Sequence, residues 1–403
     1  MPISPQPDGS MPLCKQFRMY VSKNICARKN NTCARNFIAV LLPCKSGSSS
    51  PQASRILRQQ HRYRGLQVLN AKQNFLETIK PGGKPDRIVK QFEGTKFMPL
   101  DPVNSYARSK RYQGMPPNKD AWGTVMVWPE GIVAPMPLVN EETKVIRDIA
   151  RWRDFTKVPD VIANCTDSRL WEQYLKEIEE TNREETLVMA FAPQGIFERL
   201  HFLMGLEDTL IGLMDEPEAM KDLCAAIGEH RYEHYKLVVE YAKPDIFLVQ
   251  DDWGSKTNMF MHPDVWREII KPHYVKGYKY LHDNGVIVMH HADSYMEQIA
   301  EDMASLHIDI WQGVLPQNDI VAIQKKLGGR MALMGGLDAA IVDRADSTEE
   351  EIRRETRRAL KTYCPGGNFI PCVTYGGPGT IHPGADMYIN DEIDRYNKEV
   401  FGI

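Results

Sequence analysis

The chain lacks several features that mark whole classes of protein. No apolar run approaches the roughly 20 residues that a helix needs to cross a bilayer, so we expect no membrane span. Its eight cysteines include no Cys-x-x-Cys pair, and their spacings match no common zinc module. No Gly-x-Gly-x-x-Gly follows an early strand pattern, which argues against an open dinucleotide-binding sheet.

Acidic residues are nearly absent from the first 68 positions. This segment holds eleven Lys and Arg against one acid, Asp8, a net charge of +10 that leaves −13 for the rest of the chain. It has no sustained periodicity, so we interpret residues 1–68 as a disordered basic leader. A transit-type leader is one explanation. The other explanation is that translation starts further downstream than the given sequence does, and the helix-like opening at residue 69 favours this explanation.

The remaining 335 residues have the composition of a soluble protein. The whole chain is 42% hydrophobic and 26% charged, both ordinary values, and the acidic body offers no clustered basic face for nucleic acid. Four body cysteines fit reduced thiols, so we expect a cytoplasmic protein. We treat residues 69–403 as one domain.

Strand and helix patterns alternate through this domain. This alternation predicts an α/β fold, a (β/α)8 TIM barrel with helical and hairpin excursions near its start. We expect strands over 96–100, 186–191, 245–250, 286–289, 308–311, 331–334 and 368–372, and a hairpin over 120–131. We expect helices over 69–79, 167–180, 198–213, 217–242, 263–284, 295–306, 319–327 and 347–362, and from 385 onward.

The run Val286-Ile-Val-Met-His-His-Ala-Asp-Ser294 is the strongest functional signal. Side chains at the carboxyl ends of barrel strands face the active-site mouth. His291 and Asp293 are two residues apart and lie on one side of an extended segment, whereas His290 points the other way and is expected to pack. A second strand pattern ends at Cys372.

Other polar residues follow expected strands. Asp251 and Asp252 come directly after the strand ending at Gln250, and repulsion between paired carboxylates raises the pKa of one of them, which suits an acid or a ligand. We interpret both as catalytic; the alternative is that one caps the next segment and the other is solvated. We assign substrate binding to Asp101, Trp253, Gln312 and Asp338. The string Tyr375-Gly-Gly-Pro-Gly379 is either a lid or a simple turn.

Several motifs together resemble the uroporphyrinogen decarboxylase superfamily. They are Asp251-Asp-Trp-Gly254, His262-Pro-Asp-Val-Trp266, Lys271-Pro272, Gly285, His291-x-Asp293 and Gly335-Gly-Leu-Asp338. The similarity covers roughly residues 70–403. It looks closest to the cobalamin-dependent methyltransferase branch, to which Asp120-x-Trp-Gly123 and the region of 148–152 are also similar. The resemblance implies a (β/α)8 barrel that moves methyl groups to or from a corrinoid held on a separate protein.

The sequence departs from the family pattern in two places. The Arg-Gln-Ala-Gly-Arg segment that holds substrate carboxylates in the true decarboxylases is missing, which argues against porphyrinogen decarboxylation. Zinc-bearing methyltransferases of the superfamily have His-x-Cys followed by a later cysteine. Here His291 and Cys372 match, and Asp293 stands where the first cysteine would be.

These residues allow two chemical interpretations. His291, Asp293 and Cys372 could supply three zinc ligands with one position open, the arrangement of catalytic sites. Such a zinc would act as a Lewis acid on the methyl donor or acceptor. Alternatively, Asp293 orients His291 as a general acid, while Cys372 is a small core residue.

We therefore expect an enzyme that transfers a methyl group between a methylated small molecule, such as a methoxylated compound, and the cobalt of a corrinoid protein. The alternatives are transfer from a methylcorrinoid to a thiol or tetrahydrofolate, and a decarboxylase of the same superfamily. No Asp-x-His-x-x-Gly motif occurs, so a partner protein must bring the corrinoid.

Overall fold

The computed structural model describes residues 68–108, 111–132, 134–373 and 381–403. The leader interpreted from the sequence, except for Val68, and the 375–379 loop lie outside the described residues. The described residues, from 68 onward, form one compact unit.

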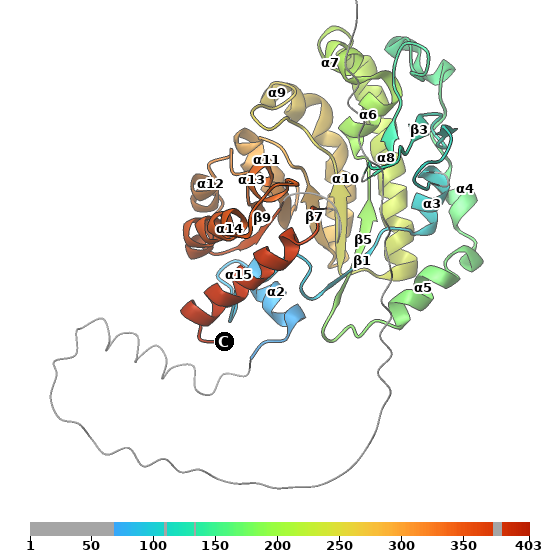
Figure 1. Ribbon diagram of the computed structural model, residues 1–403. Coiled ribbons are helices and arrows are strands. Elements are labelled where there is room, and N and C mark those ends of the chain that lie inside the picture. Colours follow the sequence, from blue (N-terminus) through green and yellow to red (C-terminus); the bar gives the residue numbers. More distant parts are fainter. Residues whose placement is uncertain (1–67, 109–110, 133, 374–380) are drawn as a thin grey trace, which may run out of the picture. The chain divides into compact units, whose positions relative to one another are not determined.

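Seven parallel strands form the main sheet of this unit (Figure 1). Their order in the sheet follows their order in the chain, as expected when each strand is joined to the next by a helical crossover. Most strand residues are buried, because helices cover one face and the barrel interior fills the other. The strands are β1 (Thr95–Met98), β5 (Leu187–Ala192), β6 (Ile246–Gln250), β7 (Ile287–His291), β8 (Ile310–Val314), β9 (Ala332–Gly336) and β10 (Phe369–Cys372).

The sheet confirms the α/β barrel-type class, but its number of strands differs from the eight that a (β/α)8 barrel has. Among the described residues it has seven, and no pairing joins β10 to β1. A turn over 91–94 precedes β1, and residues 90–93 line one cavity together with residues of β10. The gap between the first and last strands is therefore bordered by a turn, which cannot continue the hydrogen-bond ladder.

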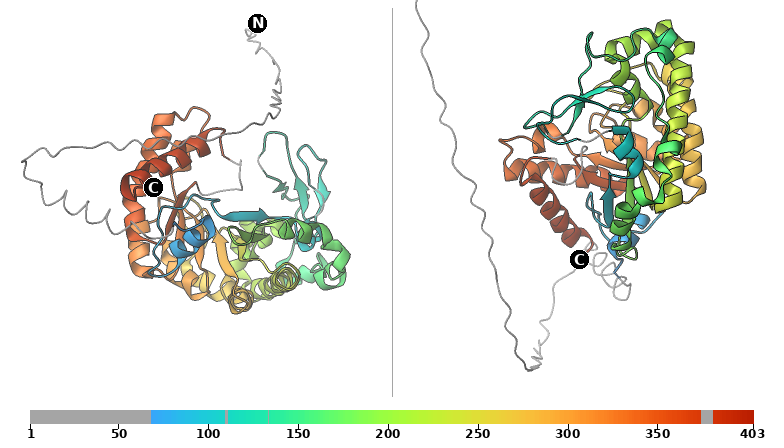
Figure 2. Two further views of the ribbon diagram at one scale, coloured as in Figure 1. Left: turned by 90° about the horizontal axis from the view of Figure 1, so that it is seen from below. Right: turned by 90° about the vertical axis from the view of Figure 1, so that its right-hand side faces the viewer.

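Helices follow the outer side of the curved sheet (Figure 2). The stretch expected over 217–242 is a single helix, but two others are broken. The helix over 198–213 divides at Gly205, whose φ of +87° leaves the helical region, and that over 263–284 divides before Pro272. The helices are α2 (Ala71–Ile79), α3 (Pro102–Arg108), α4 (Val161–Cys165), α5 (Glu172–Glu179), α6 (Ile196–Met204), α7 (Leu206–Asp215), α8 (Pro217–Ala242), α9 (Pro263–Val265), α10 (Pro272–Asp283), α11 (Ala300–Ser305), α12 (Ile320–Leu327), α13 (Ala339–Val342), α14 (Glu349–Tyr363) and α15 (Ala385–Val400).

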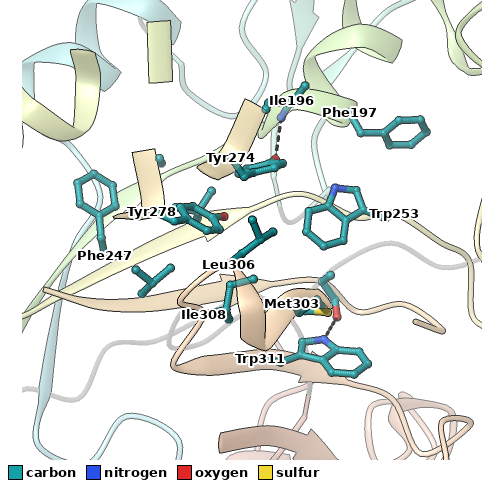
Figure 3. Close-up of a cluster of buried hydrophobic side chains, with 14 of the residues drawn as sticks. Ile196, Phe197, Phe247, Trp253, Tyr274, Tyr278, Met303, Leu306, Ile308 and Trp311 are labelled. Atoms are coloured by element: carbon teal, nitrogen blue, oxygen red, sulfur yellow. Dashed lines mark hydrogen bonds between the residues drawn. The ribbon is translucent and has the colours of Figure 1, made fainter. Parts of the chain in front are cut away.

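Alternate strand residues divide between two apolar clusters. Met289 and Ile310 belong to an inner cluster inside the curve of the sheet, which also contains Phe75 of α2. Val288 and Trp311 belong to the outer cluster against the helices (Figure 3). Because side chains alternate along a strand, this division decides which strand-end residues face the barrel interior.

A small antiparallel sheet precedes the second strand of the barrel. It consists of β2 (Asn118–Lys119), β3 (Val125–Val127) and β4 (Met136–Pro137), in that order. This sheet confirms the expected antiparallel excursion and gives it a third strand. In the described ranges, no helix is long and apolar enough to cross a bilayer, and all four body cysteines are unpaired.

Candidate functional site

Three polar side chains meet at the carboxyl ends of β6 and β7. Asp252 lies two residues beyond β6, His291 is the last residue of β7, and Asp293 follows it by two. One ligand atom from each lies within 4.8 Å of those of the other two. Neighbouring parallel strands end at one edge of a sheet, so this closeness follows from the order β6-β7.

His291 faces the barrel interior and is held in one orientation. It lies opposite Gln250 of β6 and Gln312 of β8 in the ladder. Its Nδ1 donates a hydrogen bond to Oε1 of Gln312. That bond leaves the lone pair on Nε2, the tautomer that a metal ligand or a general base requires. Gln312, expected to bind substrate, is thus placed to orient the histidine.

The two carboxyl groups of the cluster hold protons more tightly than usual. Burial raises the pKa of Asp252 to about 7, with further increases from Asp293 and Asp251 that the nearby His291 opposes. Burial also raises the pKa of Asp293. Asp252 accepts the backbone N–H of Asp293 at 2.9 Å. The opposing effects of His291 and Lys256 do not cancel these increases, and a proton or a cation can compensate the remaining negative charge.

The cluster opens into a cavity of about 570 Å³. This volume suits a small-molecule ligand. Asp252 and Asp293 line it together with Lys256, Arg344, His201 and Glu198, so acidic and basic groups share its wall. Its other lining residues are Gly254, Ser255, Phe260, Leu315, Ala339, Ala340 and Asp343.

Glu198 was not predicted from the sequence. It lies in the first turn of α6 and is only 7% exposed. Burial, followed by the charges of Asp252 and Asp251, raises its pKa well above the usual range. Gln250 donates to its Oε1 at 3.3 Å, and its Oε2 has no partner among the described residues. Its position just after β5 was the available signal, but the helical pattern around it concealed the signal.

Asp251 supports the site from beneath. Its carboxylate accepts the backbone N–H groups of Phe197 and Glu198 at 3.0 and 2.7 Å, Trp253 Nε1 at 2.7 Å, and the Tyr274 hydroxyl. It is fully buried and absent from the cavity wall. Asp251 therefore holds the first turn of α6, a helix that precedes it in the chain, whereas the alternative interpretation expected a cap of the segment that follows.

Trp253 belongs to the core. It is fully buried and packs against Trp266 and His290 and against Tyr274 (Figure 3). His290 faces the helices, as expected: Tyr278 contacts its Nδ1 at 2.7 Å, and burial lowers its pKa to about 3.

Asp101 and Asp338 each cap a helix. Asp101 accepts backbone N–H groups at the start of α3 and pairs with His234 at 3.1 Å. Asp338 accepts the N–H of Ala340 at the start of α13. Neither residue lines the cavity beside Asp252, although Asp338 immediately precedes two residues that do.

Cys372 does not join Asp252, His291 and Asp293 in the ligand cluster. It faces the inner apolar cluster, is 1% exposed, and burial raises the pKa of its thiol. The reason is its place in the sheet: β10 lies three strands from β7, whereas β6 is adjacent. The structure thus gathers a different third donor, Asp252, from the one chosen on sequence.

The three clustered donors suit a divalent cation. One imidazole nitrogen and two carboxylates match the nitrogen and oxygen ligands of zinc, and three protein ligands leave an open position. The hydrogen bond from His291 to Gln312 is the usual outer support of a metal-bound histidine. Without a cation, Asp252, whose pKa is about 7, can exchange a proton near neutral pH.

One solved structure and one family model agree with this architecture. A methyltransferase from Methanosarcina mazei superposes with a TM-score of 0.57 at 14% identity, over 81% of this chain and 99% of that one. A rutinosidase from Aspergillus niger has a TM-score of 0.29 at 9% identity, over 56% and 71%. No curated protein sequence matches the chain. Residues 122–387 match the uroporphyrinogen decarboxylase (URO-D) family, which covers well over half of the chain. The chain therefore belongs to the uroporphyrinogen decarboxylase family.

Proposed function

We propose that this protein is a methyltransferase that moves a methyl group between a methylated small molecule and the cobalt of a corrinoid carried by a partner protein. The observation that carries the proposal is the cluster of Asp252, His291 and Asp293 at the wall of the cavity. The fold shared with the Methanosarcina methyltransferase supports it. Methoxylated compounds are our proposed substrates, and transfer to a thiol or tetrahydrofolate is the alternative direction.

In this proposal the cluster binds a zinc ion, which supplies Lewis-acid polarisation of the atom that carries the methyl group. Gln312 binds Nδ1 of His291 and so leaves Nε2 to bind the ion. Without the ion, Asp252 would instead give or take the proton at the oxygen from which the methyl group departs, since its metal-free pKa of about 7 suits both roles at neutral pH. Asp251 positions Glu198 through the first turn of α6.

Metal analysis of the purified protein is the first test. We expect one zinc per chain, and at least a ~10²-fold loss of zinc affinity in His291→Ala and Asp293→Ala, since each removes a ligand. Cys372→Ala is the matched control and should retain zinc. Loss of zinc in Cys372→Ala would instead support the ligand set expected from the sequence, in which Cys372 is the third ligand. A folded wild type that binds no zinc would contradict the metal site.

Methyl transfer is tested separately by the visible spectrum of cobalamin. Incubation with cob(I)alamin and a methoxylated aromatic compound should yield methylcobalamin, and Asp252→Asn should lower the rate by ~10²–10⁴-fold, the usual contribution of a general acid or base. An unchanged rate in that variant would remove Asp252 from the chemistry.

Decarboxylation is the second candidate function. It is favoured by the family itself and by Asp252, which is about half protonated at neutral pH and could protonate the carbon from which CO₂ departs. Release of CO₂ from a carboxylated substrate without any change in the cobalamin spectrum would favour this candidate.

A further inference from the structure

Four arginines gather away from the cavity, around α3, α6 and α8. Arg108 ends α3 and Arg111 follows it, Arg199 lies on α6, and Arg231 lies on α8. We call these four residues the arginine cluster. Arg199 and Arg231 are 1% and 5% exposed, and the other two are partly buried. Arginine stays protonated in proteins, so four positive charges share a poorly solvated region.

The members of the arginine cluster are close enough to repel one another. Burial, followed by the charges of the other three arginines, lowers the pKa of Arg108 to about 9. Burial also lowers the pKa of Arg111 to about 10, and Arg199 lowers it further against the opposing effect of Asp120. Like charges in a region of low dielectric destabilise the folded chain unless negative charge compensates them.

Among the described residues, one carboxylate forms an ion pair with the cluster, while Asp251 and Glu198 interact with Arg231 at longer range. Arg199 pairs with Asp120 at 2.7 Å. No carboxylate oxygen in the described ranges lies within 4.0 Å of a nitrogen of Arg108, Arg111 or Arg231. Asp101 is near Arg108, but it already caps α3 and pairs with His234. In the described ranges, the four cations therefore share one direct ion pair, the one between Arg199 and Asp120.

Several donors of the cluster are also buried without an acceptor. Within the described part of the chain these are both terminal nitrogens of Arg111 and the Nε atoms of Arg108, Arg199 and Arg231. Trp122 Nε1, from the Asp120-x-Trp-Gly123 motif, is another; its ring lies 5.4 Å from the Arg199 guanidinium. A buried donor without an acceptor destabilises the folded chain, and ligand oxygens would remove this cost.

We propose that the arginine cluster is an oxyanion-binding site. The unpaired groups of the four arginines and of Trp122 are all donors, and the guanidinium fork matches the oxygens of a carboxylate or sulfate bidentately. The shared ligand chemistry is the oxyanion, whether it is an inorganic ion or the carboxylate of a small organic acid. The proposal does not depend on methyl transfer.

Gln194 connects this site to the candidate active site. Its Oε1 accepts from Arg199 at 2.7 Å, and its backbone oxygen accepts from Arg231. It has a φ of +60° and lies between β5 and α6. Glu198, four residues later, lines the cavity. An anion held by the cluster therefore acts on the segment that positions α6.

The test is thermal unfolding of the full chain with sodium sulfate or sodium succinate, each compared with sodium chloride at equal ionic strength. The chloride reference matters because salt alone screens the repulsion. We expect a saturable Tm increase of about 2–5 °C over chloride. A response to both salts indicates recognition of the oxyanion itself, and a response to succinate alone indicates an organic acid. Equal curves in all three salts would overturn the proposal.

Arg111→Gln and Arg108→Gln are the informative variants, because both residues are partly exposed and have no carboxylate partner. Each should lose most of the Tm response to the oxyanion. Without oxyanion each should unfold at or above the wild-type Tm, because repulsion is relieved; a purely structural arginine would lower it. Arg354→Gln, an exposed arginine on α14, is the control and should respond like wild type. Full responses in both cluster variants would overturn the proposal.

Discussion

At the scale of single residues, the fold changes the pKa of Asp252, and this change makes the stability of the protein depend on pH. That pKa is raised from the usual carboxyl range to about 7. Between those two values the folded, metal-free protein binds a proton that the unfolded chain has released. Stability must therefore fall as the pH rises through this window.

We predict that Asp252→Asn reduces this pH dependence. In metal-free wild type the free energy of unfolding should decline between about pH 4 and 7, by at most ~1.4 kcal/mol per pH unit for one proton. The variant should show a shallower decline in urea unfolding measured at several pH values. Asp154→Asn, at an exposed aspartate, is the control and should retain the wild-type slope. Equal slopes in wild type and Asp252→Asn would contradict the raised pKa.

Metal binding should have the opposite dependence on pH. Both carboxylates must be deprotonated to act as ligands, and the pKa values of Asp252 and Asp293 are raised. Zinc affinity should therefore increase as the pH rises through about 7, which titration calorimetry at pH 6 and 8 can measure. A pH-independent affinity would show that neither carboxylate is a ligand.

At the scale of elements, local signals placed most helices but not their ends. The capping pattern at Ser347-Thr-Glu-Glu350 predicted the start of a helix. In α14 the cap is Thr348, and Glu351 reciprocates by accepting the Thr348 N–H at 2.9 Å. The interruptions before α7 and α10 were not predicted, because the apolar pattern continues across Gly205 and Pro272.

Thr348→Ala should destabilise the protein by about 1 kcal/mol, since it removes the side-chain half of this capping box. The free energy of unfolding from urea titration measures the effect. Glu350→Ala removes an exposed charge from the same turn, has no hydrogen-bond or ion-pair partner in the described ranges, and should cost less. A loss no larger than that of Glu350→Ala would contradict the assigned cap.

At the scale of the whole compact unit, distant segments meet where β1 and β10 leave the sheet unpaired. Asn397 of α15 accepts the backbone N–H of Ile88 at 2.8 Å and donates to its carbonyl at 3.0 Å. Asn368, just before β10, donates to the carbonyls of Thr78 and Lys80. These bonds satisfy irregular backbone that the ladder does not reach.

Asn397→Ala should therefore lower the free energy of unfolding by about 1–3 kcal/mol, because it leaves two backbone groups of Ile88 without partners. Asn397 itself is only 4% exposed. Asn390→Ala, on the same helix and without a hydrogen bond in the described ranges, is the matched control. Chemical denaturation compares the two. Equal stability of both variants would mean that water replaces the lost bonds.

The sequence by itself determined the barrel-type class and the strand end that carries the site. Alternation of strand and helix patterns depends on neighbours in the chain, as does the opposite orientation of His290 and His291, so both were readable without a structure. The family resemblance was likewise carried by short motifs.

Only the tertiary structure decided which residues share the site. Asp252 joins His291 because β6 adjoins β7, while Cys372 is three strands away, and no local pattern contains that order. Asp251 and Trp253 follow a strand just as Asp252 does, yet packing under α6 buries them. Glu198 and the arginine cluster come from helices whose contacts are set by packing across the fold. Chemistry at one strand end is a local property, but the composition of a site depends on distances between segments that are far apart in the chain.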